Sequence, residues 1–245
     1  MDLERSTILI TGAAKRVGAV IAMTLAQAGA KHIILHYHRS AIAARTLAGR
    51  LIKLGTKQVS LISADLSDHE DVKDLAQTVK RIAPDLDAIV FNASVYEKTP
   101  LGRVSEAAWN AQFDVNLKSV FFLSQELGVP MRKRGGKIIL LGDWSGLRPY
   151  ADHIPYCLSK TGILYLTHAL AKALAPKVMV NCILPGPVLM PESAPASFAR
   201  AAKTATLLKR LGKPEDVAKA VRFFLKDADF STGSWLTVDG GRLIA

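Results

Sequence analysis

The chain has 245 residues, of which 49% are hydrophobic and 22% are charged, the composition of an ordinary folded protein rather than a disordered or fibrous one. Its two cysteines, Cys157 and Cys182, are too few for a disulfide framework or a Cys-rich zinc site, which favours a reducing compartment. The net charge of +11 is compatible with anionic partners, but the basic residues are scattered, which disfavours nucleic-acid binding.

We expect a cytoplasmic protein. Residues 1–5 are charged and lack the basic-then-apolar layout of a secretory signal peptide. No uncharged apolar stretch is long enough to span a bilayer. The densest basic cluster, Arg132, Lys133 and Arg134 with Lys137, surrounds two glycines, and we interpret it as a solvated turn between a helix and a strand.

Short apolar runs alternate with longer amphipathic stretches along the chain. The runs are rich in Ile, Val and Leu and show little period-2 alternation, which is typical of strands covered on both faces. We predict strands at residues 7–11, 32–37, 58–63, 88–92, 137–142, 178–183 and 235–238. We predict helices at about 17–28, 41–54, 68–82, 106–127, 155–175 and 214–225. Asp68 is the expected cap of the third helix, and Gly29 and Gly55 are expected to follow the ends of the first two.

This alternation predicts an α/β fold of the Rossmann type, a doubly wound and mostly parallel seven-stranded sheet with helices on both faces. Repeats, linkers and low-complexity tracts are absent from the sequence, so we expect one nucleotide-binding domain over residues 1–245. In such sheets ligands bind outside the carboxyl ends of the strands. Functional residues should therefore come just after each strand.

The turn after the first strand has the features of a phosphate site. Gly12 permits a sharp exit from the strand, and Gly18 permits close packing of the next helix, whose N-terminal N–H groups then face a phosphate. The middle glycine of such motifs is replaced by Arg16, which adds a cation beside the expected pyrophosphate. A plain strand-to-helix turn is the competing interpretation.

The end of the second strand indicates which dinucleotide binds. An NAD site usually has an acidic residue there for the ribose hydroxyls, whereas this chain has Arg39 and Ser40. These side chains donate to a 2′-phosphate, so we predict NADP. After the third strand, Asp65 is a candidate for the adenine amine or a simple cap of the next helix.

Tyr156 and Lys160 are four residues apart at the start of a predicted helix, so they share a face. Asp143 follows the fifth strand thirteen residues earlier, which returns the pair to the expected nucleotide site. We expect the ammonium of Lys160 to shift the pKa of the phenol toward neutrality and make Tyr156 a general acid.

Together these residues resemble a classical short-chain dehydrogenase/reductase over essentially the whole chain. The matching pieces are Thr11-Gly12 with Gly18, Asn92-Ala93-Ser94, Asp114-Val115-Asn116, Tyr156 with Lys160, Pro185-Gly186 and Val238-Asp239-Gly240-Gly241. The resemblance implies that Tyr156 is the acid, that Lys160 lowers its pKa and binds the nicotinamide ribose, and that Asn116 holds a water of the proton relay. It also implies hydride transfer between the nicotinamide and an unsaturated carbon, and a homotetramer formed through the helices at 106–127 and 155–175.

Asp143 departs from the family pattern, which has serine thirteen residues before the tyrosine. An ionised carboxylate only accepts hydrogen bonds and repels a carbonyl oxygen that gains negative charge. It suits a reacting nitrogen that must be protonated, with Asp143 supporting proton delivery through Tyr156 or being itself protonated part of the time. Ser145, two residues further on, is a second candidate for the serine's role.

Three features resemble the pteridine reductase branch of the family, which includes dihydromonapterin reductases: Arg16, the run His36-Tyr37-His38-Arg39-Ser40, and Asp143. In that branch the segment after the fourth strand supplies a serine and an aromatic ring that stacks on the pterin. The corresponding residues here are Ser94 and Tyr96.

The resemblance implies the following site residues. The cofactor set is Gly12, Arg16, Val17, Gly18, His38, Arg39, Ser40, Asp65, Leu66, Asn92, Ala93, Ser94, Tyr156, Lys160, Pro185, Gly186 and Val188. The substrate set is Arg16, Ser94, Tyr96, Asp143 and Tyr156, and the catalytic set is Asn116, Asp143, Tyr156 and Lys160. The family's threonine after Pro185-Gly186 is missing, which puts its usual contact with the nicotinamide amide in doubt.

The segment 190–203 is rich in Pro, Ala and Ser, and we predict a mobile lid there. We expect no metal site, and a packing role for Cys157 beside Tyr156. The first hypothesis for function is an NADPH-dependent reductase of a C=N bond in a pterin, dihydropterin or dihydrofolate-like heterocycle. The alternatives are a carbonyl reductase of an oxoacyl thioester, sugar or other ketone, and a non-catalytic nucleotide-binding scaffold.

Overall fold

The computed structural model describes residues 1–190 and 196–245. Seven parallel strands form one sheet in the order β3-β2-β1-β4-β5-β6-β7. They are β1 (Thr7–Ile10), β2 (His32–Tyr37), β3 (Gln58–Ser63), β4 (Ala88–Phe91), β5 (Gly136–Leu141), β6 (Val178–Pro185) and β7 (Trp235–Val238). All seven predicted strands are present, and the Rossmann-type architecture is confirmed.

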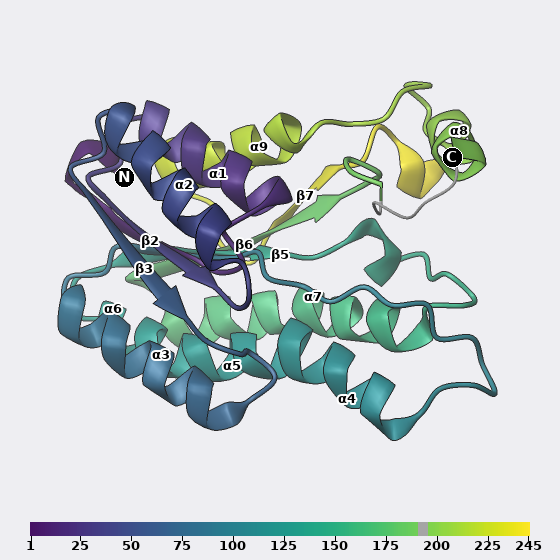
Figure 1. The fold of residues 1–245 in the computed structure, drawn as a ribbon, viewed down its shortest axis with the longest axis horizontal. Helices are drawn as coiled ribbons and strands as arrows, with labels where there is room; N and C mark the ends of the chain where they lie inside the picture. Colours follow the sequence, from purple (N-terminus) through teal and green to yellow (C-terminus); the bar gives the residue numbers. More distant parts are fainter. Residues whose placement is uncertain (191–195) are drawn as a thin grey trace.

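Helices cover the sheet on both faces (Figure 1). One layer contains α1 (Arg16–Gln27), α2 (Ala41–Lys53) and α9 (Pro214–Lys226), and the other contains α3 (His69–Ile82), a helical run over 106–131, and α7 (Ile154–Leu174). The two hydrophobic cores follow these layers. Ile8 and Ile10 of β1 face α1 and α9, and Leu9 between them belongs to the other core. The central strands β1 and β4 are buried on both faces, which explains their unbroken apolar sequence.

Several predicted boundaries follow from local chemistry. Asp68 caps α3 by accepting from the N–H groups of Glu70 and Asp71, and Gly29 and Gly55 have positive φ angles just after α1 and α2. These predictions are confirmed.

The predicted helix at 106–127 is not a regular α-helix. It consists of α4 (Glu106–Phe113), α5 (Ser119–Leu123) and α6 (Val129–Met131), joined by π-helical turns at Asp114–Lys118 and Ser124–Gly128. The first π turn contains Asn116. Such turns are frequent at functional sites because they re-aim a side chain without ending the helix.

One further prediction needs correction. Lys137 does not lie in a solvated turn: it is buried, and its ammonium donates to the carbonyls of Phe224 and Ala228 and to Asp229 at the end of α9. The predicted lid contains a helix, α8 (Ala196–Ala205), and its residues 191–195 lie outside the described ranges. Within those ranges, no helix is both long and apolar enough to cross a membrane.

The switch in strand order lies between β1 and β4, where consecutive crossovers run to opposite sides. In doubly wound sheets a crevice opens at this point beyond the carboxyl ends of the strands. The residues after β1, β4, β5 and β6 therefore converge there.

Candidate active site

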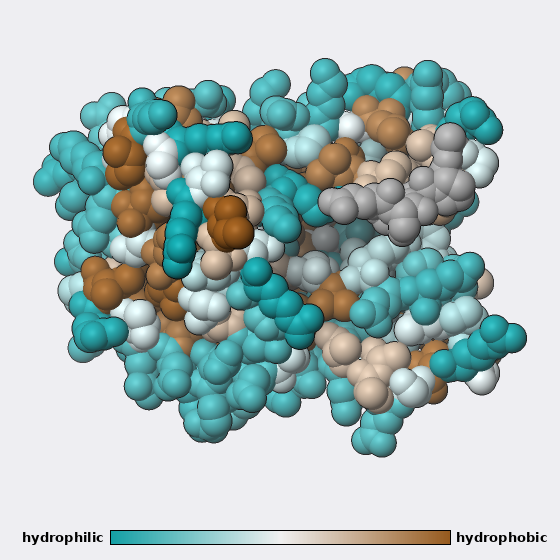
Figure 2. All heavy atoms as spheres, in the orientation of Figure 1, coloured by the Kyte–Doolittle hydropathy of each residue, from teal (hydrophilic) through white to brown (hydrophobic). Residues whose placement is uncertain are grey.

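A cavity of about 760 Å³ lies at the carboxyl edge of the sheet. Its walls come from the segments after β1, β4, β5 and β6, from the start of α7 and from α8. Figure 2 shows a hollow on this face between the two helical layers, bordered by both apolar and hydrophilic side chains. Most of the predicted site residues line it: Gly12, Arg16, Val17, Gly18, His38, Asp65, Leu66, Asn92, Ala93, Ser94, Tyr96, Asp143, Tyr156, Lys160, Pro185, Gly186 and Val188.

The turn between β1 and α1 leaves backbone donors free. Lys15 is the N-cap of α1 but makes no capping hydrogen bond with its side chain, so the first N–H groups of this helix remain available to an anion. Gly12 has φ +61°, and a Cβ on Gly18 would lie 2.4 Å from the carbonyl oxygen of Gly12. Asn92 reinforces the turn by donating to the carbonyls of Thr11 (2.9 Å) and Gly12 (3.0 Å).

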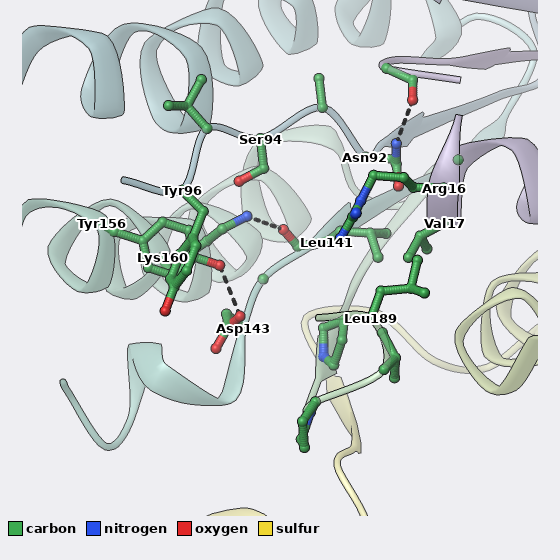
Figure 3. Close-up of a pocket in the computed structure, with 18 of the residues that line it drawn as sticks. Arg16, Val17, Asn92, Ser94, Tyr96, Leu141, Asp143, Tyr156, Lys160 and Leu189 are labelled. Carbon is green, nitrogen blue, oxygen red and sulfur yellow. Dashed lines mark hydrogen bonds between the residues drawn. The ribbon is translucent and has the colours of Figure 1, made fainter. Parts of the chain in front are cut away.

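Arg16 takes an unusual backbone conformation for a non-glycine residue, with φ +54°. Its guanidinium reaches across the cavity and donates to the carbonyl oxygen of Met190 at 3.3 Å. Arg16 therefore lies between the expected phosphate turn and the segment that follows β6 (Figure 3).

His36 supports the same turn from β2. The N–H of Gly12 donates to its Nδ1 (3.1 Å), and its Nε2 donates to the carbonyl of Ala64 (3.1 Å). Burial lowers the pKa of His36 to about 4, so the ring is neutral at physiological pH and keeps one acceptor and one donor. His36 was quoted above only as part of a motif. Its position at the end of a buried strand, one residue before the surface, is the signal that could have revealed this role.

Arg39 and Ser40 line an adjoining hollow of about 530 Å³ rather than the main cavity. The two spaces share Gly12, His38 and Asp65, so they are continuous along the sheet edge. Asp65 accepts from the N–H and hydroxyl of Ser67 and lies 3.5 Å from His38. It does not cap α3, because Asp68 does so.

Tyr156, Asp143 and Lys160 meet at the other end of the cavity (Figure 3). The Tyr156 hydroxyl donates to Oδ2 of Asp143 at 2.8 Å, and Oδ1 of Asp143 accepts from the N–H of Ser145 at 2.7 Å. The Lys160 ammonium donates to the carbonyl of Leu141 at 2.9 Å and lies 5.7 Å from the centre of the Tyr156 ring. The Asp143 carboxylate is thus hydrogen-bonded directly to the Tyr156 hydroxyl.

The expected lowering of the Tyr156 pKa is wrong for this state of the protein. Burial and the neighbouring Asp143 carboxylate raise the pKa of Tyr156 well above its ordinary value. Burial also lowers the pKa of Lys160, while the neighbouring Asp143 carboxylate acts in the opposite direction and raises it. Burial also raises the pKa of Asp143, against the hydrogen bonds from Ser145 and Tyr156. The three groups together therefore favour a protonated phenol and a carboxyl group that holds a proton more tightly than usual.

Tyr96 completes this end of the cavity. Its ring stacks on His153 with centroids 4.4 Å apart and meets the Tyr156 ring edge-on at 4.7 Å. It is 40% exposed, so a flat ligand can reach it.

Asn116 does not line the cavity. It is buried, and its Oδ1 accepts from the N–H of Val95 (2.8 Å) and the hydroxyl of Ser94 (3.1 Å). Its Nδ2 donates to the carbonyl of Val95 (3.0 Å) and to Ser159 (3.1 Å). Asn116 therefore ties the segment that carries Ser94 and Tyr96 to α7.

Ser145 is a poor substitute for the family serine. It is buried, its hydroxyl has no partner among the described residues, and it is not part of the cavity wall. The wall residues outside the predicted set include Trp144, Tyr150 and Arg242. Trp144 and Tyr150 follow β5, where functional residues are expected, but only the structure shows that Arg242 reaches the cavity. The described ranges contain no group of three His, Cys, Asp or Glu side chains suited to a metal ion.

Comparisons with known proteins match the chain to reductases and dehydrogenases. Residues 12–242 match a family model described as enoyl-(acyl carrier protein) reductase. The 3-oxoacyl-[acyl-carrier-protein] reductase FabG of Thermotoga maritima is 30% identical over the full length of both chains. Galactitol 2-dehydrogenase of Agrobacterium fabrum is 32% identical, with 98% of each chain covered.

Two similar solved structures contain a bound nicotinamide cofactor. FolM alternative dihydrofolate reductase 1 from Brucella suis, solved in complex with NADP, is 27% identical with a TM-score of 0.91, covering 99% of this chain and 97% of the other. A blue fluorescent protein from a metagenomic library, solved in complex with NADPH, is 27% identical with a TM-score of 0.90 and 99% coverage of both chains.

Proposed function

Because this chain belongs to the short-chain dehydrogenase/reductase family, a family of oxidoreductases, we propose that it uses NADPH to reduce a C=N bond of a dihydropterin or dihydrofolate-like heterocycle. The observation that carries the proposal is the hydrogen bond between Tyr156 and Asp143. Through this bond the Tyr156 hydroxyl, the proton donor, contacts the carboxyl group of Asp143. A carbonyl reductase of this family needs a hydroxyl group at position 143 instead.

The cofactor fits the residues present. The uncapped N-terminus of α1 and the close turn at Gly12 and Gly18 offer backbone donors to a pyrophosphate. Arg39 and Ser40, at the adjoining hollow, offer donors to a 2′-phosphate. The FolM and blue fluorescent protein structures, each solved with an NADP species, support this assignment. When bound, the cofactor supplies the hydride.

The chain's own residues then move the proton. Tyr156 gives its hydroxyl proton to the substrate nitrogen as the adjacent carbon is reduced. A protonated Asp143 replaces it across the 2.8 Å hydrogen bond, which its raised pKa makes possible. The Lys160 ammonium lies beside the phenolate formed in this step and stabilises its charge. Tyr96 offers a ring face at the cavity wall on which a flat heterocycle stacks.

The test is an NADPH-oxidation assay over dihydropterins, dihydrofolate and representative ketones, with NADH as the cofactor control. We expect turnover of the heterocycles, and a preference for NADPH of roughly ten- to hundredfold from charged hydrogen bonds to the 2′-phosphate. Tyr156→Phe should lower kcat by about 10²–10⁴-fold, whereas Tyr165→Phe on the exposed side of α7 should not. Asp143→Ser should impair turnover of the heterocycles. Unchanged turnover in that variant would remove the role assigned to Asp143.

The second candidate is reduction of a 3-oxoacyl thioester or another ketone. It is favoured by the names of the relatives, several of which are 3-oxoacyl-[acyl-carrier-protein] reductases. Rapid turnover of ketones with no binding of pterins would select it.

We also infer a homotetramer, a proposal supported by apolar side chains on the outer surface of the helical run and α7. Phe121, Val129, Leu158 and Tyr165 are each more than two-fifths exposed, which is costly unless another subunit covers them. Light scattering that gives a monomer mass would refute this inference.

A further inference from the structure

Arg242 is held at the cavity by a well-defined turn near the end of the chain. The Asp239 carboxylate accepts from the N–H groups of Gly241 (2.9 Å) and Leu243 (2.7 Å), and thereby fixes the 3₁₀ turn Arg242–Ile244. Gly240 and Gly241 both have positive φ angles, 62° and 78°, so the sharp approach to this turn depends on glycine.

The guanidinium at the end of the Arg242 side chain is also held in place. It lies over the indole of Trp144, 4.7 Å from the ring centre, and Trp144 is itself buried and contacts Tyr150 edge-on. This stacking holds one face of the guanidinium but uses none of its N–H donors. Among the described residues, no carboxylate lies within 4 Å of Arg242 to take up its charge. A cation whose N–H donors have no partner among the described residues therefore faces the cavity.

The place of Arg242 in the cavity decides what it can bind. Lys15 is the N-cap of α1 and Arg16 is its first residue, so both cations start from the expected phosphate end. The buried Lys160 donates to the carbonyl of Leu141. Arg242 instead lies over Trp144, and both line the cavity together with Tyr150. Trp144 directly follows Asp143 in the chain. Its charge is therefore available to the substrate rather than to the cofactor phosphates.

We propose that Arg242 binds a carboxylate on the substituent of the heterocycle, and that the protein therefore prefers substrates with an acidic tail, such as dihydrofolate, over neutral dihydropterins. The inference rests on the proposed function and adds a specificity residue to it. A guanidinium matches a carboxylate with two parallel N–H donors. An uncharged substituent of similar size gains no such pair and leaves the cation partly desolvated.

The experiment compares KM and kcat for dihydrofolate and dihydrobiopterin in the wild type, Arg242→Gln and Arg242→Lys. A charged hydrogen bond contributes roughly ten- to hundredfold in affinity, so Arg242→Gln should raise KM for dihydrofolate by about tenfold or more and leave KM for dihydrobiopterin within about twofold. Arg242→Lys should fall between, because it keeps the charge and loses the paired donors. The control is Arg222→Gln, which removes the same charge from the exposed side of α9 and should leave both values unchanged.

The outcomes separate the two proposals. If Arg242→Gln shifts both KM values equally, or neither, Arg242 only braces the turn against Trp144 and the inference is overturned while the proposed function stands. If the wild type turns over neither heterocycle, the proposed function fails and this inference fails with it.

Discussion

Asn116 offers a direct test of how the substrate end of the cavity is held together. Four hydrogen bonds join its carboxamide to the N–H and carbonyl of Val95 and to the hydroxyls of Ser94 and Ser159, besides a long contact of 3.5 Å to Gln112. At roughly 0.5–1.5 kcal/mol each, the loss of these four in Asn116→Ala should lower the free energy of unfolding by about 2–6 kcal/mol. The segment that carries Ser94 and Tyr96 should also lose its fixed position, so kcat/KM for the heterocycle should fall by more than tenfold.

The control is Asn181→Ala. Asn181 is equally buried, and its amide binds the carbonyl of Ser231 (2.7 Å) and the N–H of Ser234 (3.1 Å), away from the cavity. Urea unfolding should show a comparable loss of stability in both variants, while NADPH-oxidation kinetics should change only in Asn116→Ala. A loss below 1 kcal/mol in Asn116→Ala, or equal kinetic effects in the two variants, would refute the reasoning.

Three further predictions concern the cofactor turn, a buried cation and a buried acid. In Gly18→Ala the new Cβ would lie 2.4 Å from a backbone oxygen, so a fluorescence titration should show NADPH binding weakened at least tenfold. The control Gly49→Ala should bind NADPH normally, because its Cβ meets nothing within 4 Å. Lys137→Met leaves two carbonyls at the end of α9 without their donor, so urea unfolding should show a free energy of unfolding lower by about 2–5 kcal/mol. The control Lys177→Met, at an exposed lysine, should show no measurable loss. Burial raises the pKa of Asp143, so its contribution to stability is full below the ordinary carboxyl pKa of about 4 and is lost as the pH rises through the raised value. The melting temperature of Asp143→Asn relative to wild type should therefore increase from pH 4 to pH 8, and a constant difference would contradict this assignment.

The sheet was predictable because its signals are local and strong. β2, β3 and β7 begin and end at the predicted residues. β2 is buried along most of its length, whereas β3 and β7 are the edge strands and are largely exposed or half-buried. The π turn around Asn116 was not predictable. A π turn has i→i+5 hydrogen bonds in place of the i→i+4 bonds of an α-helix, and the partners of Asn116, Val95 and Ser159, are 21 and 43 residues away in the chain.

The candidate site was predictable as a set of residues but not as a set of interactions. Position after a strand identified Asp143, because parallel strands deliver such residues to one edge. The four-residue spacing with Lys160 at the start of a helix identified Tyr156. The direction of the Tyr156 pKa was wrong because spacing shows that Lys160 is near but does not show how deeply both groups are buried or that Asp143 bonds the phenol directly. Lys137 was misplaced for the same reason, since its partners come from α9 about ninety residues later.

The two ends of the cavity depend on the sequence in different ways. At the phosphate end the donors are backbone N–H groups of α1, which the strand-turn-helix geometry provides once Gly12 and Gly18 allow it. At the substrate end the groups to which the proposed function gives a role are side chains, and one substitution changes their chemistry. A serine at 143 would offer a donor to a carbonyl oxygen, while the aspartate can only accept or pass on a proton. Cofactor use should therefore follow from membership of the family, whereas under the proposed function we expect the choice between a C=N bond and a ketone to depend on Asp143 and its bond to Tyr156.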